Sequence, residues 1–86
     1  MAKRTAEDQR TYEGNKQRMY RRDGWKCRYC GSRSMLTPHH LVFQSHGGTD
    51  DLENLLCLCM KCHDDVHERR LLIEIVDAVI KFWRKP

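Results

Sequence analysis

Two Cys-x-x-Cys pairs constrain this chain more than any other feature of its sequence. Cys27 and Cys30 form the first pair, and Cys59 and Cys62 form the second, with 28 residues between the pairs. A two-residue spacer lets both thiolates of a pair reach the same tetrahedral ion, with Zn–S distances of about 2.3 Å. Two such pairs complete a four-coordinate shell without an open position. The pattern therefore predicts a structural zinc site that contributes folding free energy.

Disulfides and a redox dithiol are the alternatives to zinc. A disulfide framework requires an oxidising compartment, but the basic start Met-Ala-Lys-Arg has no apolar stretch behind it and does not read as a signal peptide. The cysteines also number five, which is odd. Cys57 lies among leucines, so we expect a small buried apolar residue there. A fifth ligand or a reactive thiol is the alternative for Cys57.

The short length of the chain favours a stabilising metal site or cross-link of this kind. A chain of 86 residues, 40% hydrophobic and 33% charged, buries only about 60–65% of its unfolded surface and builds a small core. The longest nearly apolar stretch without a charge, Asn54 to Met60, falls far short of the roughly 20 residues that a membrane span needs. We expect one domain over residues 1–86 and a cytoplasmic location. A large multi-domain enzyme is excluded.

The charge is distributed unevenly along the chain. Residues 1–35 carry a net charge of +6, residues 36–69 carry −4 and residues 70–86 carry +2, within a total of +4. A basic N-terminal segment beside a centre rich in His, Cys and Asp indicates a polyanion-binding lobe next to a cation site. The alternative is a solvated helix face.

Periodicity and turn residues predict the order of the elements. A basic helix is expected over residues 5–22, with Thr5 and Asp8 in the positions of a capping box and Asp23-Gly24 as its end. A strand over 39–43, a loop over 44–51, a second short run over 54–58 and a helix from 61 to about 69 follow. The apolar residues at helical spacing further on predict an amphipathic helix over 71–84; they are Leu72, Ile75, Val76, Val79, Ile80 and Trp83.

All five histidines fall within a span of 29 residues: His39, His40, His46, His63 and His67. His63 and His67 are four apart on a predicted helix, so they face one side and can share a cation. His39 and His40 are adjacent on a predicted strand and point to opposite faces, so one can face a metal and the other a substrate. A solvated helix face and a polar strand end are the alternatives for the two pairs. Asn54 could hold the Gly47-Gly48 loop through its backbone, or be a plain turn residue.

Taken in order, these motifs resemble the zinc-bearing branch of the HNH endonuclease family. The resemblance covers about residues 21–67 and rests on Arg-Asp-Gly-Trp-Lys-Cys-Arg-Tyr-Cys-Gly, His-His-Leu-Val, Gly-Gly-x5-Asn-Leu and Leu-Cys-x-x-Cys-His-x-x-x-His. It implies an α+β fold, in which a small ββα-metal, treble-clef-like domain is stapled by the four-cysteine zinc site. Helices would flank this domain at both termini.

The resemblance also implies a metal-dependent DNA endonuclease with defined site residues. His40 would be the general base, and Asn54 would orient the loop and hence the base. His39 and His63 would hold the catalytic metal, with His67 as a third ligand found in only part of the family. His46 has no fixed role in the family; a contact with DNA from its loop and no function at all are the two alternatives. We expect basic residues of the first helix and the turn after it to follow the phosphate backbone of double-stranded DNA; they are Arg18, Arg21, Arg22, Lys26 and Arg28.

The chemistry of the residues agrees with this implication. A neutral histidine accepts a proton from water near pH 7, and a divalent cation stabilises charge on the phosphate and the leaving oxygen. An imidazole-rich shell favours Mn²⁺, Co²⁺, Ni²⁺ or Zn²⁺ over Mg²⁺, so we expect Mn²⁺ to support the better cleavage.

One such site cuts one strand, so a nicking monomer is expected, with a dimer through the C-terminal helix as the alternative. Two rival functions stay open. One is a non-catalytic zinc-stapled module that binds nucleic acid, and the other is a phage-packaging accessory protein, in keeping with a bacterial or prophage source.

Overall fold

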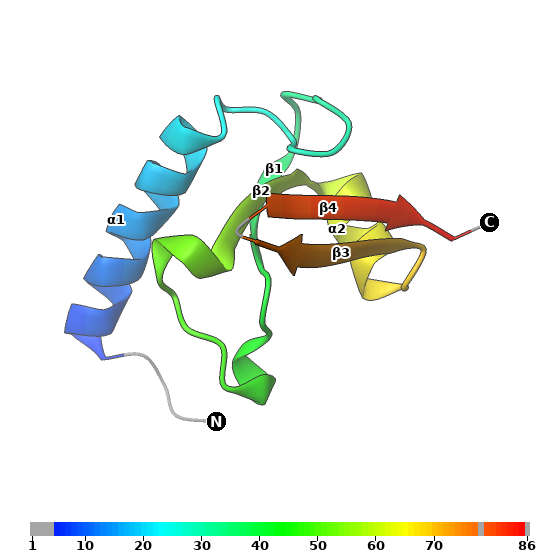
Figure 1. Ribbon diagram of the computed structural model, residues 1–86. Coiled ribbons are helices and arrows are strands. Elements are labelled where there is room, and N and C mark those ends of the chain that lie inside the picture. Colours follow the sequence, from blue (N-terminus) through cyan, green and yellow to red (C-terminus); the bar gives the residue numbers. More distant parts are fainter. Residues whose placement is uncertain (1–4, 78, 86) are drawn as a thin grey trace.

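The computed structural model describes residues 5–77 and 79–85; the first four residues of the basic start lie outside this range. The elements in chain order are α1 (Ala6–Arg22), β1 (Leu36–His40), the short 3-10 turns η1 (Gln44–His46) and η2 (Leu52–Asn54), β2 (Leu55–Cys59), α2 (Met60–His67), β3 (Leu71–Val76) and β4 (Val79–Arg84). Figure 1 shows α1 along one side of the molecule, α2 and the β3–β4 hairpin on the other, and β1 and β2 between them. The predicted α+β class is confirmed.

Helix α1 begins and ends with the signals that its sequence carries. The Thr5 side chain accepts a hydrogen bond from the Asp8 N–H at 3.0 Å, and the Asp8 carboxylate accepts one from the Thr5 N–H at 3.4 Å, so the capping box is present. Acidic residues lie in the first turn and basic ones in the last, which complements the helix dipole. Gly24 then adopts a φ of 72° and turns the chain away from the helix axis.

The centre of the fold is a ββα unit. Strands β1 and β2 pair antiparallel with Leu36 opposite Cys59 and His40 opposite Leu55, and α2 follows β2 directly. The observed strand therefore begins and ends three residues earlier than the predicted strand over 39–43. Pro38 is inside β1, where a two-stranded sheet tolerates a residue without an N–H.

Strand β2 is buried along its whole length because apolar side chains cover both of its faces. Leu56 and Leu58 belong to a cluster that also holds cysteines of the two pairs and Leu71. Leu55 and Cys57 belong to a second cluster with Met19 of α1. Burial on both faces explains why β2 reads as a continuous apolar run instead of an alternating one.

The predicted helix over residues 71–84 is wrong, because this segment is an antiparallel hairpin. β3 and β4 pair with Leu72 opposite Trp83 and Val76 opposite Val79. The segment is rich in β-branched and aromatic residues, which favour strands. Asp77 takes a φ of 51° between the two strands, a conformation that Asp tolerates in tight turns. The alternative of a dimer through a C-terminal helix therefore has no structural basis, because this segment is a hairpin.

The two faces of the hairpin differ in burial. On the inner face, Leu71 is fully buried and Ile73, Ile80 and Phe82 pack against the first cluster. On the outer face, Leu72 and Trp83 are 42% and 45% exposed. Arg84 anchors the end of the hairpin to α2 by donating to the Asp65 carboxylate at 2.7 Å. None of the helices described in the chain is long and apolar enough to cross a membrane.

Candidate functional site

The four paired cysteines converge at one end of the ββα unit. Cys27 and Cys30 lie in the turn after α1, Cys59 ends β2, and Cys62 lies in the first turn of α2. Their sulfur atoms all lie within 4.8 Å of one another. The Cys30 and Cys59 sulfurs are 3.6 Å apart, close to the roughly 3.8 Å edge of a tetrahedron with Zn–S bonds of about 2.3 Å and well beyond an S–S bond of about 2.05 Å. The predicted set is thus positioned to hold a metal ion, and four sulfur donors suit zinc.

Backbone groups favour the thiolate of Cys27, the first cysteine of the first pair. Gly31 adopts a positive φ of 79°, and its N–H donates to the Cys27 carbonyl at 3.0 Å. Burial would raise the pKa of Cys27, but hydrogen bonds from the backbone N–H groups of Cys30, Cys59 and Tyr29 outweigh it and lower the pKa to about 7. The thiolate, which is the form that binds metal, is therefore favoured.

Cys57 stands apart from this cluster. Its side chain is fully buried in the second core cluster, and burial together with the charge of Asp23 raises the pKa of its thiol to about 11. A thiol of this kind is unreactive. The expectation of a small buried apolar residue is confirmed.

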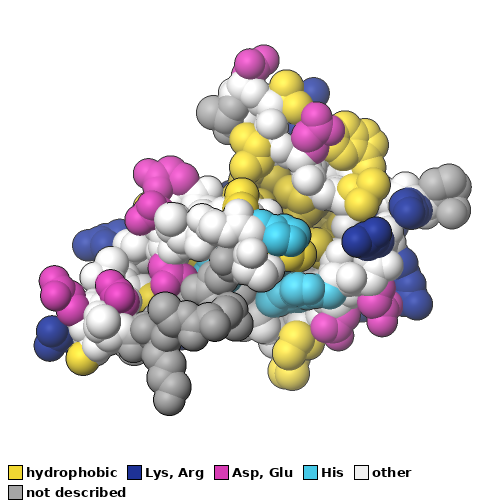
Figure 2. All heavy atoms as spheres, turned by 90° about the horizontal axis from the view of Figure 1, so that it is seen from below, with side chains coloured by type: hydrophobic (Ala, Val, Ile, Leu, Met, Phe, Trp, Pro, Cys, Tyr) yellow, Lys and Arg dark blue, Asp and Glu magenta, His cyan; other side chains and the backbone are white. Residues whose placement is uncertain are grey.

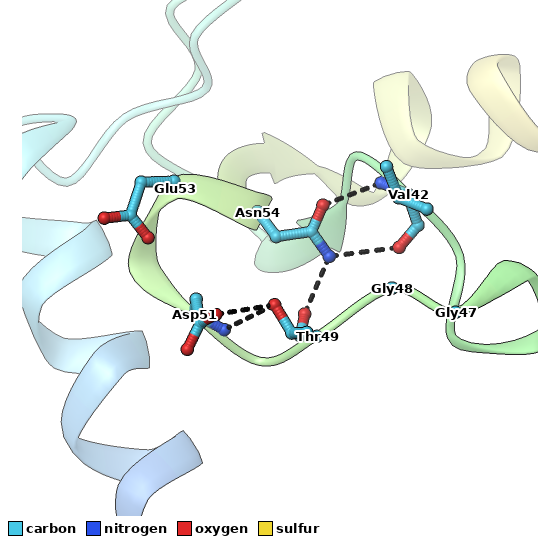
Figure 3. A pocket seen from close by; sticks show the side chains of 7 residues that line it. All are labelled: Val42, Gly47, Gly48, Thr49, Asp51, Glu53 and Asn54. Carbon is cyan, nitrogen blue, oxygen red and sulfur yellow. Dashed lines mark hydrogen bonds between the residues drawn. The ribbon is translucent and has the colours of Figure 1, made fainter.

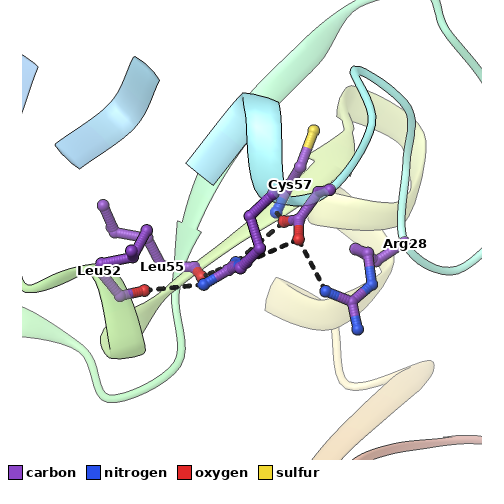
Figure 4. A network of polar contacts seen from close by, with 6 residues as sticks. Arg28, Leu52, Leu55 and Cys57 are labelled. Carbon is purple, nitrogen blue, oxygen red and sulfur yellow. Dashed lines mark hydrogen bonds and ion pairs between the residues drawn. The ribbon is translucent and has the colours of Figure 1, made fainter. Parts of the chain in front are cut away.

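A buried carboxylate joins the first cysteine turn to the sheet. Asp23, only 4% exposed, accepts hydrogen bonds from the Arg22 guanidinium at 2.7 and 2.9 Å, from the Arg28 guanidinium at 2.7 Å and from the Cys57 N–H at 2.9 Å. Figure 4 shows how these groups meet between α1 and β2. Burial would raise the pKa of Asp23, but these hydrogen bonds outweigh it and hold the pKa below its usual value. The end of α1 is therefore fixed to the strand that leads into the second cysteine pair.

Three of the five histidines form a second group of donor atoms. His39 comes from β1, and His63 and His67 come from successive turns of α2. One ring nitrogen of each lies within 4.8 Å of the others, and the ring centroids are 4.7 to 5.9 Å apart. Figure 2 shows histidine side chains gathered on the face seen from below. The structure thus brings together the three predicted ligands of a catalytic metal.

The state of His39 fits a metal ligand. The ring is 2% exposed, and its Nδ1 is buried without a hydrogen-bond partner among the described residues. An orphaned nitrogen of this kind is costly unless something else binds it. Burial, followed by repulsion from the neighbouring histidines, lowers the pKa of His39 to about 4. The ring is therefore neutral near pH 7, which is the form that coordinates a cation.

Thr37 sets the orientation of the second ligand. Its hydroxyl donates to the Leu58 carbonyl at 2.9 Å and lies 2.7 Å from the Nδ1 of His63. Because a hydroxyl has one hydrogen, which the carbonyl takes, Nδ1 of His63 must donate to it. The lone pair of His63 is then on Nε2, and a fixed tautomer of this kind is typical of histidines that bind metal.

A cavity of about 320 Å³ opens beside the three rings. His40 also lines it, so the predicted general base and the predicted metal ligands share one space. Phe43 forms another wall and stacks on the His67 ring with a centroid separation of 5.3 Å. A cavity lined by three clustered histidines and by the imidazole of His40 can hold a phosphate and a water molecule.

Asn54 closes the loop between the two strands, as predicted. Its Oδ1 accepts from the Val42 N–H at 2.8 Å, and its Nδ2 donates to the carbonyls of Val42 and Thr49 at 3.0 and 2.7 Å. Figure 3 shows these bonds spanning the loop beside a pocket of about 270 Å³. Gly48 passes so close that an added Cβ would lie 1.8 Å from the Val42 carbonyl oxygen. Only glycine fits there, so the second glycine of the pair has a steric cause, whereas Gly47 adopts a positive φ of 83°.

Comparison with known proteins agrees with this geometry. A family model described as HNH endonuclease matches residues 27–69, which is half of the chain. The chain belongs to the HNH endonuclease family. The HNH match contains both cysteine pairs, the three clustered histidines, His40 and Asn54, and it leaves α1 and the β3–β4 hairpin outside.

One curated relative is similar over most of its length. It is named Anaredoxin, from Nostoc sp. (strain PCC 7120 / SAG 25.82 / UTEX 2576), and is 35% identical over 54 residues, covering 62% of this chain and 71% of that protein. No solved structure matches this HNH chain.

The remaining predicted HNH site residue, His40, lies next to two residues that the sequence did not single out. Its Nε2 is 2.8 Å from the Asp50 carboxylate, and its ring stacks on Tyr12 of α1 with a centroid separation of 5.9 Å. Asp50 lies in the loop that Asn54 closes, and, because its contact with His40 depends on the path of this loop, no signal in the sequence pointed to it. Thr37, Phe43 and Tyr12 gave no such signal. His46, which has no implied role, is exposed.

The five basic candidates for DNA binding differ in their surroundings. Arg22 uses all three guanidinium nitrogens inside the molecule, on Asp23 and on the carbonyls of Leu52 and Leu55. Arg28 shares the same carboxylate. Arg18, Arg21 and Lys26 are exposed, and Arg18 donates to Asn15 at 2.9 Å. Arg18, Arg21 and Lys26 are therefore more available to a phosphate than Arg22 is.

Proposed function

We propose that this HNH protein is a divalent-metal-dependent endonuclease that hydrolyses phosphodiester bonds of double-stranded DNA. The observation that supports it best is the cavity shared by His39, His63, His67 and His40. Three histidine donors within 4.8 Å suit one cation and leave coordination positions open, unlike the four cysteines. Membership of the HNH family supports nuclease chemistry and nucleic-acid binding in general.

In this proposal His40 is the general base. Its Nδ1 lone pair takes a proton from a water molecule as the water oxygen attacks phosphorus, and the bond to the 3′ oxygen breaks. A divalent cation held by His39, His63 and His67 supplies stabilisation for the charge on the phosphate and the leaving oxygen. Asn54 keeps the loop, and so the wall beside His40, in place. Arg18, Arg21 and Lys26, with Arg22 and Arg28 behind them, attract the DNA backbone.

The proposal includes a monomer that nicks one strand, because the chain carries one such cavity among the described residues and one cavity cuts one bond. It also includes loose sequence specificity, since residues 5–77 and 79–85 show no evident base-reading module beyond the ββα core. A cytoplasmic location in a bacterial or phage-infected cell stays a prediction from the sequence.

The test is cleavage of supercoiled plasmid by purified protein in Mn²⁺, Mg²⁺ or EDTA. Wild type should give open-circular DNA with Mn²⁺ and none with EDTA, and His40→Ala should reduce the rate at least 100-fold. His46→Ala is the matched control, since His46 is an exposed histidine of the same region, and it should cleave like wild type. Zinc content by elemental analysis checks that all three proteins are folded. Plasmid binding without cleavage in every metal would favour the non-catalytic zinc-stapled binding module.

A further inference from the structure

The imidazole of His40 is held from two sides. Its Nε2 meets Oδ1 of Asp50 at 2.8 Å, and both side chains are less than one-fifth exposed, at 18% and 19%. The Tyr12 ring lies against the imidazole at a centroid separation of 5.9 Å with an interplanar angle of 22°. A hydrogen bond at one edge and a ring against one face together restrict rotation about both side-chain torsions.

The contact with Asp50 also selects the tautomer of His40. A carboxylate oxygen only accepts hydrogen bonds, so Nε2 of His40 carries the hydrogen and donates it. In a neutral ring the lone pair is then on Nδ1. A general base needs its lone pair on a defined atom, because proton transfer depends on hydrogen-bond reach to the water.

Helix α1 holds the backbone of Asp50 in turn. Asn15, only 9% exposed, donates from Nδ2 to the backbone carbonyl of Asp50 at 3.0 Å. Its Oδ1 accepts from the Arg18 guanidinium at 2.9 Å. A buried amide costs free energy unless its polar atoms are bonded. Both polar atoms of the Asn15 amide have partners, and the partner of Nδ2 belongs to Asp50, the residue that contacts His40.

We propose that helix α1 braces the general base of this enzyme, with Tyr12, Asn15 and Asp50 as positioning residues. They act through His40 by fixing the plane and the tautomer of its ring. α1 lies before the first residue of the HNH match, at position 27, so Tyr12 and Asn15 are additions of this chain to the motif, whereas Asp50 lies within the match. The catalytic part of the proposal rests on the proposed function, whereas the structural part does not.

The first test replaces the carboxylate. Asp50→Asn keeps the shape but offers an amide that can also donate, so the tautomer of His40 is no longer selected. We expect kcat to fall about tenfold or more with KM within a factor of two. Asp51→Asn is the matched control, because this neighbouring carboxylate contacts Thr49 instead of His40. An unchanged kcat in Asp50→Asn, or an equal fall in Asp51→Asn, would overturn the brace.

The second test replaces the ring on α1. Tyr12→Leu should lower kcat severalfold, and Tyr12→Phe, which keeps the stacked ring, should restore it. Tyr20→Leu is the matched control, because Tyr20 packs on the same core cluster from the same helix but stacks on Trp25. A merely structural role predicts equal losses for the two leucine variants, and that result would contradict the proposal.

The third test does not depend on cleavage. Nitrogen-15 NMR of the zinc-loaded protein should report His40 as the Nε2–H tautomer in wild type and a mixture of tautomers in Asp50→Asn. A wild-type ring protonated on Nδ1 would overturn the brace even in an active enzyme. If wild type shows the expected tautomer but cuts no DNA, the brace stands and the proposed function fails.

Discussion

His39 and His40 are neighbours in sequence, yet the fold gives them opposite surroundings. Alternation along β1 turns His39 into the interior, where its Nδ1 has no described partner, and leaves His40 partly exposed beside Asp50. In the proposed function, His39 holds a cation and His40 accepts a proton. The division of labour between them follows from a strand geometry that places consecutive side chains on opposite faces.

The environment of His39 predicts a pH dependence of stability. The ring has an ordinary pKa near 6.5 when unfolded and about 4 when folded, so only the unfolded chain binds a proton between these values. The free energy of unfolding should therefore fall as the pH drops below 6.5, by about 1 kcal/mol between pH 7.5 and 5.5 for this group alone.

Denaturant unfolding of protein with zinc on the cysteines and no other metal, at pH 7.5 and 5.5, measures this loss. His39→Leu removes the titrating group and serves as the comparison. The two proteins should differ in slope with pH; parallel pH profiles would show that His39 is not buried as a neutral ring.

The sequence predicted the candidate metal ligands better than it predicted the residues that contact them. The four cysteines and the three clustered histidines were identifiable because metal ligands have few residue types and fixed spacings. Thr37 and Asp50 were not, because their contacts depend on the register between β1 and β2 and on the path of the loop. Contacts across 26 and 10 residues of sequence carry no local pattern.

At the scale of elements, the loop before β2 depends on glycine at one position. A Cβ at Gly48 would lie 1.8 Å from the Val42 carbonyl oxygen, so Gly48→Ala must move the backbone that Asn54 holds. We expect a loss of about 2 kcal/mol or more in unfolding free energy and a large loss of cleavage.

Gly14→Ala is the contrasting variant. Gly14 lies inside α1, and the nearest atom to an added Cβ is the end of a flexible arginine at 3.9 Å. Alanine there should stabilise the protein by roughly 0.5–1 kcal/mol. Thermal unfolding of the two variants side by side gives the signs, and a stabilised Gly48→Ala would show that the loop is not packed as described.

The C-terminal hairpin predicts which of two neighbouring leucines contributes more to stability, and a helix over the same residues predicts the opposite order. Leu71 is fully buried on the inner face, while Leu72 is 42% exposed on the outer face. Leu71→Ala should cost about 2–4 kcal/mol and Leu72→Ala less than about 1 kcal/mol. A helix over 71–84 would bury Leu72 and expose Leu71. Denaturant unfolding of the two alanine variants therefore decides between the structures.

The helix prediction for this segment was wrong for a definite reason. Apolar residues are so frequent there that they satisfy both a helical stripe and a strand alternation, and spacing alone does not separate the two. The β-branched content and the short gap at Asp77 were the signals for a hairpin. By contrast, α1 carried a capping box and a glycine stop, and its predicted bounds differ from those of the structure by one residue at the N-terminus.

For the whole molecule, the two groups of ligands differ in chemistry and should respond differently to metal removal. Mild chelation should release the cation from the three histidines and stop cleavage while the circular dichroism spectrum stays unchanged. Loss of zinc from the four cysteines should unfold the protein, because a small core cannot replace the free energy that the metal contributes. Simultaneous loss of spectrum and activity at every chelator concentration would contradict two separate sites.

The histidine ligands also rank the metals. Imidazole suits Mn²⁺ and later first-row ions better than Mg²⁺, which prefers oxygen ligands. Nicking rates at equal ionic strength should therefore be higher in Mn²⁺ than in Mg²⁺. Equal or faster nicking in Mg²⁺ would argue against a shell made of His39, His63 and His67 alone.

Helix α2 carries a ligand of each group within eight residues, with Cys62 in its first turn and His67 at its end. Two turns of helix do not persist in water unaided, so the cysteine site must order the element that presents two of the histidines. In the proposed enzyme, oxidation of the cysteine sulfurs would then stop cleavage without altering any residue that lines the histidine cavity. We therefore expect the proposed cleavage activity to require a reducing environment that supplies zinc.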